Sequence, residues 1–386
     1  MAVPGLVAMR AGWSRHVLLV HDAYDDYVTC LANTLGERVH LTVLHNSRVH
    51  DRIRRGLSGS QQTIVYPHRR VRDPRRIGEI PHIDRVAATV GADVVHVQQS
   101  NDPLFNLVQL CSRRSHGTRV LTVHDITPHP GDAAHVPGGH LTLRAQSRRW
   151  DRVVVHADVL RSDLARAWNV PHARVDVVPH GELGSLYRPA DSVGTDTARP
   201  AATLRVLFFG RVWPYKGLDR LISAMNRLAT ARPTLTLTIC GTGEPLDRYL
   251  QLVEPQLTIE VVDRFVEHEE VAPLFASATV VCLPYLEASQ SGVQALACGL
   301  GVPVVATDVG GLASAVADGQ SGLVVPPDDV GALTTALGRV LDDPTLRDRL
   351  AKGSRTRSAT DLSWEAIADQ TLEVYRRARA GHGAFI

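Results

Sequence analysis

Two cations and a glycine in the second half of the chain have the spacing of a phosphate-binding loop. Phe209-Gly210-Arg211 ends an apolar run, and Lys216-Gly217 opens a helical pattern five residues after the arginine. Glycine lets a backbone approach a phosphate closely, a helix N-terminus supplies free N–H groups, and two cations neutralise negative charge. Lys216 is also one of only two lysines among 42 basic residues. We therefore expect that this position needs the geometry of a lysine ammonium, which an arginine would not supply. Surface cations near a turn are the alternative.

The densest polar stretch of the second half is PYLEASQSGVQALACGLGVPVV, residues 284–305. It places a carboxylate, Glu287, in a loop between an apolar run and a helix of small residues. The carboxylate suits sugar hydroxyls, and the N–H groups at the helix start suit a diphosphate. A glycine pair in another loop after an apolar run lies where a nucleotide would pass, although glycines are common in such loops. The residues that these patterns predict for donor binding are Gly210, Gly241, Gly243, Ser289, Gln290, Ser291, Gly292 and Val293.

In the first half, the first apolar run is followed by the acidic segment HDAYDDYVT. Asp22, Tyr24, Asp25 and Asp26 would lie at the C-terminal end of a strand, facing any cleft between two domains. Three carboxylates there favour a cationic or polyhydroxylated ligand, such as an aminocyclitol, over a phosphorylated one. Ordinary capping at a helix start by aspartate is the alternative interpretation.

Short runs of Val, Leu and Ile alternate with helix-length segments along the chain. Such continuous apolar strands are typical of parallel sheets covered by helices on both faces, so the sequence predicts an α/β protein. The predicted strands are His16–His21, Asp93–Gln98, Arg119–Asp125, Arg152–His156 and Val175–Pro179 in the first half, and Leu204–Gly210, Leu235–Gly241, Thr279–Pro284, Pro303–Asp308 and Gly322–Pro326 in the second.

A small, polar, strandless segment divides these strands into two sets of similar size. We predict a Rossmann-like first domain over residues 13–189, a linker over 190–203 and a Rossmann-like second domain over 204–362. Residues 363–386 contain an amphipathic pattern that predicts a C-terminal helix, which either crosses back to brace the first domain or packs on its own. Two facing, doubly wound domains would bring their strand C-termini together along a shared cleft.

Composition excludes several other classes of protein. The net charge of +2, from 42 basic and 40 acidic residues, argues against a nucleic-acid partner. A run of arginines offers a peripheral membrane contact, but Asp and Pro interrupt it, so a solvated loop is favoured; its members are Arg69, Arg70, Arg72, Arg75 and Arg76. No apolar run reaches the length of about 18 residues that a membrane helix needs.

The sequence also predicts a cytoplasmic protein without a cofactor. The N-terminus lacks the pattern of a signal peptide, and the five cysteines show no CxxC pair, as expected of reduced thiols. Neither Asp-x-Asp nor HExxH occurs, and the 18 histidines are scattered, so no metal site is expected.

Taken together, the motifs resemble family-4 retaining glycosyltransferases, whose GT-B architecture has two facing Rossmann-like domains. The second half carries FGR…KG, GTG, PYLEASQSGV and PVVATDVGGL, and the first half carries DVVHVQ, VLTVHD and DRVVVHAD in the family's order. The resemblance implies a metal-independent bacterial enzyme that moves a sugar from a UDP- or GDP-linked donor to a hydroxyl with retained configuration. The first domain would bind a glycan, lipid-linked or small polyhydroxylated acceptor, and the second would bind the donor.

The resemblance also implies roles for particular residues. Arg211 and Lys216 would stabilise the departing diphosphate, Glu287 would contact the donor sugar, and His124 would lie beside the reacting sugar. The alternative for His124 is a histidine satisfied within its turn. Two features depart from the family pattern: the second glutamate of the donor motif is replaced by an apolar residue, and the first loop lacks a double glycine.

Two other functions stay open at this level. A nucleotide-sugar 2-epimerase can share the two-domain architecture, but it would need acid and base carboxylates in the cleft and no second substrate. A binding protein could keep the nucleotide site and lose the chemistry, and the missing second glutamate is the feature that favours it.

Overall fold

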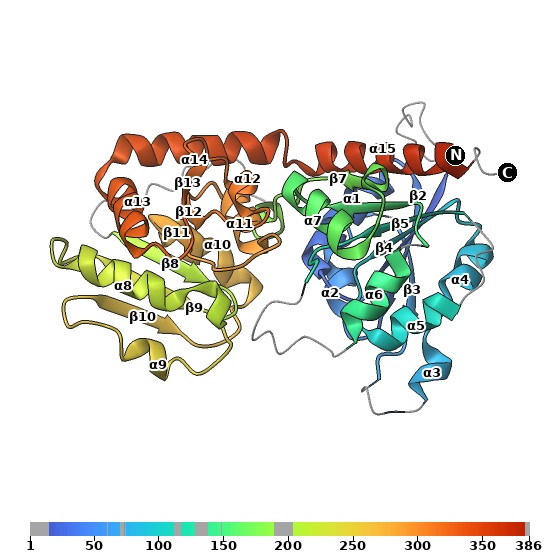
Figure 1. Ribbon diagram of the computed structural model, residues 1–386, viewed down its shortest axis with the longest axis horizontal. Helices are drawn as coiled ribbons and strands as arrows, with labels where there is room; N and C mark the ends of the chain where they lie inside the picture. The colour runs from blue at the N-terminus through green and yellow to red at the C-terminus, as the bar shows by residue number, and fades with distance from the viewer. Residues whose placement is uncertain are drawn as a thin grey trace, which may run out of the picture.

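The computed structural model describes residues 15–59, 61–69, 73, 75–111, 117–127, 138–147, 149–188 and 204–382. Within these ranges the chain forms two separate parallel β-sheets, one from each half of the sequence (Figure 1). The central strands are buried along their whole length, which explains why they are continuous apolar runs. The predicted linker, residues 190–203, lies outside the described residues.

The first domain has a seven-stranded sheet in the order β3-β2-β1-β4-β5-β6-β7. All its strand pairs are parallel, so each connection crosses over through a helix or loop on a face of the sheet. The strands are β1 (His16–His21), β2 (His40–Asn46), β3 (Gln62–Tyr66), β4 (Val94–Gln98), β5 (Thr118–Thr122), β6 (Arg152–Val155) and β7 (Val175–Val177). The helices are α1 (Asp25–Gly36), α2 (His50–Gly56), α3 (Arg76–Glu79), α4 (Ile83–Val90), α5 (Pro103–Cys111), α6 (Gly139–Ser147) and α7 (Asp158–Trp168).

The second domain repeats this design with six parallel strands in the order β10-β9-β8-β11-β12-β13. Its strands are β8 (Arg205–Phe209), β9 (Thr236–Cys240), β10 (Thr258–Val262), β11 (Val280–Leu283), β12 (Val304–Thr307) and β13 (Gly322–Val325). Its helices are α8 (Leu218–Ala229), α9 (Asp247–Leu250), α10 (His268–Ser277), α11 (Gly292–Gly299), α12 (Leu312–Val316), α13 (Val330–Asp342) and α14 (Pro344–Ala359). In both sheets the chain order reverses beside the first strand, and this switch point is where α/β sheets bind ligands.

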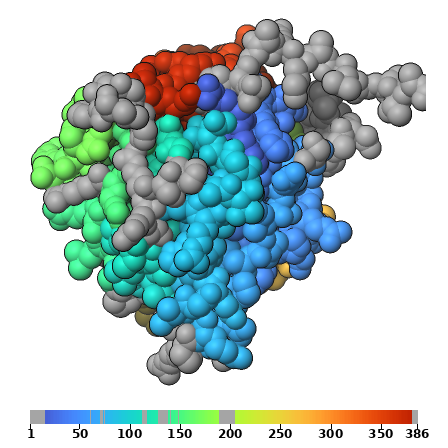
Figure 2. Space-filling model, turned by 90° about the vertical axis from the view of Figure 1, so that its right-hand side faces the viewer, coloured from blue at the N-terminus to red at the C-terminus, as the bar shows by residue number. Residues whose placement is uncertain are grey.

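The last helix, α15 (Trp364–His382), runs on from α14 and lies along the first domain (Figures 1 and 2). The indole N–H of Trp364, at the start of this helix, donates to the carbonyl of Glu182 at 2.6 Å. The hydroxyl of Tyr375 lies 2.7 Å from Nδ1 of His96. The Asp369 carboxylate also pairs with a surface arginine of the first domain at 2.6 Å. The helix that ends the described chain is therefore part of the first domain's core.

The described arginines of the basic run are ion-paired inside the first domain. Arg69 pairs with Glu79 and with Asp73, and Arg75 also pairs with Asp73. Arg76 is buried and bonded to Asp102. Arg70 and Arg72 lie outside the described residues. None of the described helices is long and apolar enough to cross a membrane.

Candidate active site

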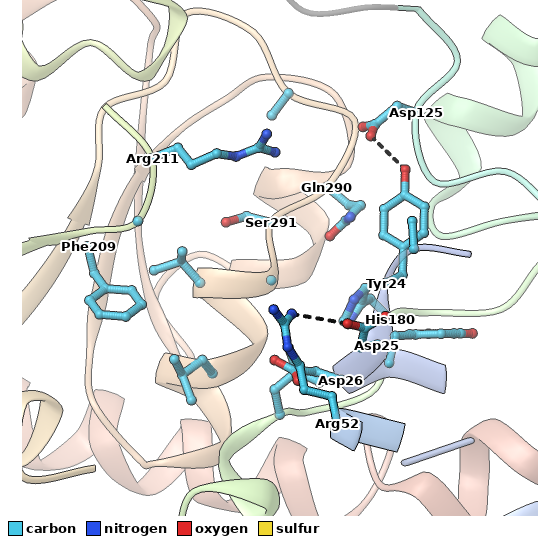
Figure 3. A pocket seen from close by; sticks show the side chains of 18 of the residues that line it. Tyr24, Asp25, Asp26, Arg52, Asp125, His180, Phe209, Arg211, Gln290 and Ser291 are labelled. Atoms are coloured by element: carbon cyan, nitrogen blue, oxygen red, sulfur yellow. Dashed lines mark hydrogen bonds and ion pairs between the residues drawn. The ribbon is translucent and has the colours of Figure 1, made fainter. Parts of the chain in front are cut away.

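A cleft of about 620 Å³ lies between the two domains. Its walls are the loops that follow the C-terminal ends of β1, β2, β5 and β7 on the first domain, and of β8 and β11 on the second. Parallel strands bring these loops to one edge of each sheet, as the sequence predicted. Figure 3 shows Arg211, Gln290 and Ser291 on one side of the cleft, opposite Tyr24 and Asp125 on the other.

Both predicted phosphate-binding cations line the cleft. Arg211 follows β8 directly, after Gly210, whose φ of 107° gives the turn a conformation that favours glycine. Lys216 ends a short 3₁₀ turn, and its ammonium lies 3.7 Å from the centroid of the Tyr285 ring. The pKa of Lys216 is lowered to about 8, mainly by burial; Tyr215 acts against this shift and the neighbouring Arg211 adds to it. A bound diphosphate would favour the charged form of this lysine.

Gly241 and Gly243 do not line the cleft; they pack against the loop that carries Arg211. A Cβ on Gly241 would lie 1.8 Å from the carbonyl oxygen of Gly210, and one on Gly243 would lie 2.0 Å from that of Val212. Hydrogen bonds join the same two loops, because the amide of Val212 donates to the Thr242 carbonyl at 2.9 Å. In this structure these glycines let two loops approach closely and so support the loop of Arg211, and their donor-binding role stays a prediction.

The helix start predicted for a diphosphate faces the cleft. Ser291 caps α11 by accepting a hydrogen bond from the amide of Gln294 at 3.3 Å, and Gly292 and Val293 begin the helix on the cleft surface. Gln290 also lines the cleft, and its buried amide oxygen has no hydrogen-bond partner among the described residues. Uncompensated burial of such an oxygen is costly, so this atom is suited to a ligand hydroxyl.

Two neighbours in the same loop lie elsewhere. Glu287 is exposed and is not part of the cleft wall, and Ser289 is buried behind it, where its carbonyl accepts from the amide of Gly311 at 3.0 Å. In this structure the sugar-binding role predicted for Glu287 is therefore not supported by its position. The cause is local, because the polar loop before α11 turns the Glu287 side chain toward solvent.

His124 is also absent from the cleft wall. Its ring is fully buried, with Nε2 lying 3.0 Å from the amide oxygen of Gln98 and Nδ1 lying 3.1 Å from Nε2 of His156. Tyr24 covers the ring from the cleft side, in a stacked arrangement with 3.8 Å between centroids. Burial holds the pKa of His124 well below its ordinary value, and His156 and His180 add to this effect. Both ring nitrogens have protein partners in this structure, and the role of His124 beside the sugar stays a prediction.

The acidic loop of the first domain lines the cleft as predicted, but each carboxylate has a protein partner. Asp22 accepts from the hydroxyl of Ser100 at 2.6 Å, and burial raises its pKa to about 6. Asp25 accepts from Arg52 at 3.1 Å (Figure 3), while its other oxygen is buried without a hydrogen-bond partner among the described residues and lies 4.0 Å from Nδ1 of His21. Asp26 accepts from the hydroxyl of Tyr187 at 2.7 Å. Arg52 offsets the negative charge of Asp25, whereas the two hydroxyl groups each occupy one acceptor oxygen, of Asp22 and of Asp26.

Sequence reasoning missed several residues of the cleft wall, among them Arg48, Arg52, Asp125, His180 and Tyr187. The two arginines follow β2, which the sequence did not predict as a strand. Asp125 directly follows His124 in the motif VLTVHD, so this motif could have indicated Asp125 as well. In the described part of the chain, no group of three or more His, Cys, Asp or Glu side chains is arranged to hold a metal ion.

Structural comparison supports the two-domain fold over almost the whole chain. Sucrose-phosphate synthase from Thermosynechococcus elongatus superposes with a TM-score of 0.70 at 21% identity, covering 95% of this chain and 100% of that one. HepE from Anabaena, solved with UDP and glucose, gives a TM-score of 0.68 at 15% identity, covering 94% and 99%. At these identities the likeness shows the fold, which is the GT-B arrangement of two Rossmann-like domains.

Sequence comparison adds the family. D-inositol 3-phosphate glycosyltransferase from Nocardioides is 37% identical over 274 residues, which are 66% of this chain and 58% of that protein. Glycogen synthase from Mycobacterium tuberculosis is 34% identical over 199 residues, 49% of this chain and 48% of that protein. The chain thus spans less than two thirds of the length of these curated relatives. The model of glycosyltransferase family 4 matches residues 25–181 and that of glycosyl transferases group 1 matches 203–343, so the chain belongs to the group 1, family 4 glycosyltransferases.

Proposed function

We propose that this protein transfers a sugar from a nucleotide-sugar, UDP- or GDP-linked, to a hydroxyl of an acceptor and keeps the anomeric configuration. The observation that carries the proposal is the convergence of Arg211, Lys216 and the N-terminus of α11 on one wall of the interdomain cleft. Family membership supports it, and favours neither an epimerase nor a binding protein.

In this proposal the second domain stabilises the leaving group. Two fixed cations and the free N–H groups of Gly292 and Val293 face the position where a diphosphate would gain negative charge as the glycosidic bond breaks. Because these groups are held in place before the reaction, they need little reorganisation during it. The same charges would bind the diphosphate without a metal bridge, and closure of the two domains would exclude water.

For the acceptor, the first-domain wall favours a small polyhydroxylated molecule. It presents carboxylates that are already bonded to Ser100, Arg52 and Tyr187, together with Arg48, so both hydrogen-bond acceptors and cations are available. This mixture no longer favours a cationic acceptor over a neutral one. Several relatives are named D-inositol 3-phosphate glycosyltransferase, and this name supports a polyol as the acceptor.

The donor site is tested by the thermal stability of the protein with UDP, GDP, ADP and TDP, each with and without magnesium. We expect one diphosphate at about 100 times its Kd to stabilise the wild type by about 2.7 kcal/mol. Lys216→Ala should abolish most of this effect and lower kcat about 100-fold or more. Affinity should also fall above pH 8, as Lys216 loses its proton. Lys352→Ala is the matched control, because the only other lysine is exposed on α14.

Failure of every nucleotide to stabilise the wild type would overturn the donor site. Product analysis separates the remaining functions: transfer gives a new glycoside, an epimerase converts the donor without an acceptor, and a binding protein gives no product.

The acceptor wall is tested by replacing two of its carboxylates. We expect the double variant Asp25→Asn, Asp26→Asn to raise the acceptor KM about 10-fold, because hydrogen bonds to charged groups contribute about 1.5–3 kcal/mol. Donor KM should be unchanged. Asp51→Asn, on the exposed side of α2, is the control. An unchanged acceptor KM, measured with myo-inositol and D-inositol 3-phosphate, would show that these aspartates serve only their contacts with Arg52 and Tyr187.

A further inference from the structure

Tyr24 holds an unusual backbone conformation at the cleft. Its φ of 63° and ψ of 43° lie in the left-handed region, which bulky residues seldom adopt. Strain of this kind is kept where the surroundings impose it, and such positions cluster at functional sites. Here the conformation lays the phenol ring flat on His124 and lets its hydroxyl donate to Oδ2 of Asp125 at 3.2 Å.

Asp125 is held rigidly from behind as well. The amide oxygen of Gln99 accepts from the backbone N–H groups of both His124 and Asp125, at 2.7 and 2.8 Å. The amide nitrogen of Gln99 donates to the Asp125 carbonyl at 3.1 Å, and its side chain is fully buried. A buried clamp and a phenol hydroxyl therefore position this carboxylate, which is the kind of preorganisation that binding sites require.

The pair faces the donor wall across the cleft. Tyr24 and Asp125 both line it, opposite Arg211 (Figure 3), and Lys216 lines the same cleft. Burial lowers the pKa of Lys216 and raises the pKa of Tyr24; across the gap, Asp125 acts against the first shift and Arg211 against the second. A group beside Asp125 is thus close to the place where the diphosphate would leave.

We infer that Asp125, positioned by Gln99 and Tyr24, receives the hydroxyl of the acceptor, while Tyr24 closes off His124 behind it. This inference rests on the proposed transferase function. The acceptor O–H donates to the Asp125 carboxylate, which directs the hydroxyl oxygen toward the sugar on the opposite wall. His124 supports this arrangement from the interior, through Gln98 and His156, and does not contact substrate.

The first test replaces the carboxylate by its isosteric amide. Asp125→Asn keeps the Gln99 contacts, which go to the backbone, and still accepts from Tyr24. We expect kcat/KM for the acceptor, assayed with myo-inositol and D-inositol 3-phosphate, to fall about 10- to 100-fold. Affinity for the nucleoside diphosphate should be retained or higher, because a negative charge opposite Lys216 is removed. Asp163→Asn, on the surface of α7, is the matched control.

A tenfold loss of nucleotide affinity in Asp125→Asn, or unchanged acceptor kinetics, would overturn the inference. Failure of the wild type to bind any of UDP, GDP, ADP or TDP would instead count against the proposed function itself. Tyr24→Phe keeps the stacked ring and removes only the hydroxyl, so it should raise the acceptor KM and leave the donor KM unchanged.

The second test needs no substrate. Diethylpyrocarbonate should modify the exposed His172 of the wild type and leave His124 unmodified, as measured by mass spectrometry of the two peptides. In Tyr24→Gly, whose glycine suits the left-handed backbone, His124 should become reactive. Equal modification of His124 and His172 in the wild type would show that Tyr24 does not close off this histidine.

Discussion

Acidification from pH 7.5 to pH 5 is expected to cost this protein about 6 to 7 kcal/mol of unfolding free energy. Burial lowers the pKa to about 3 for His21, His96 and His156 and to about 4 for His180. Below their unfolded pKa of about 6.5, these histidines bind protons in the unfolded chain but not in the folded one. Stability therefore falls as the pH drops through 6.5, by about 2 kcal/mol per histidine at pH 5. Asp22, with its pKa raised to about 6, offsets about 1 kcal/mol of this loss.

Urea denaturation at several pH values measures this effect. The slope of the unfolding free energy between pH 5 and 6 should be about 4 kcal/mol per pH unit, the linkage of about three protons. Replacing one buried histidine by His96→Gln should lower the slope by about one proton, whereas His172→Gln, at an exposed position, serves as the control. A slope below that of one proton would show that these histidines are hydrated in the folded state.

Replacement of Gly241 by alanine is expected to destabilise the second domain by about 4 kcal/mol. A Cβ would meet the carbonyl oxygen of Gly210 at 1.8 Å, and the φ of 143° is itself strained for alanine. Relief of the contact would shift the loop that carries Arg211, so binding of the nucleoside diphosphate should weaken as well. Gly319→Ala is the matched control, because it has a φ of 70° with no atom within 4 Å of its Cβ.

Thermal denaturation and isothermal titration calorimetry with UDP and GDP measure the two consequences of Gly241→Ala. The difference between the two glycine variants measures the steric contact together with the additional strain of a φ of 143° over one of 70°. Equal stability of the two variants would mean that the loops separate without cost, and nucleotide binding would then be expected to survive.

The fold could be predicted well because its central strands are buried on both faces. All ten predicted strands occur, with ends that differ by a few residues. Three strands were not predicted. β3 and β10 are sheet edges with half-exposed polar faces, and β2 contains two buried polar residues, Thr42 and His45. The Thr42 hydroxyl bonds to His16, and Nδ1 of His45 lies 3.0 Å from the carbonyl oxygen of Asn46. Periodicity cannot distinguish such a strand from a loop.

The residues of the candidate site likewise fall into those whose positions the sequence predicts and those whose positions it does not. Arg211, Lys216 and the start of α11 follow strands that the sequence predicted, so strand order alone brings them to the cleft. The position of His124 depends instead on one left-handed residue, Tyr24, which stacks on its ring, and that of Glu287 depends on the path of one loop. Nothing in the spacing of residues indicates that a tyrosine will occupy the space in front of a histidine.

The packing of α15 on the first domain has a consequence for synthesis of the protein. His96 bonds to Tyr375, which is 279 residues later in the chain. At 5–20 residues per second, the ribosome needs about 15 to 55 s to make the intervening segment. During this time the first domain has emerged while the surface that Trp364 and Tyr375 will cover is still open to water. Protection of nascent chains by chaperones should therefore persist until the last helix leaves the ribosome, although the first domain is translated early.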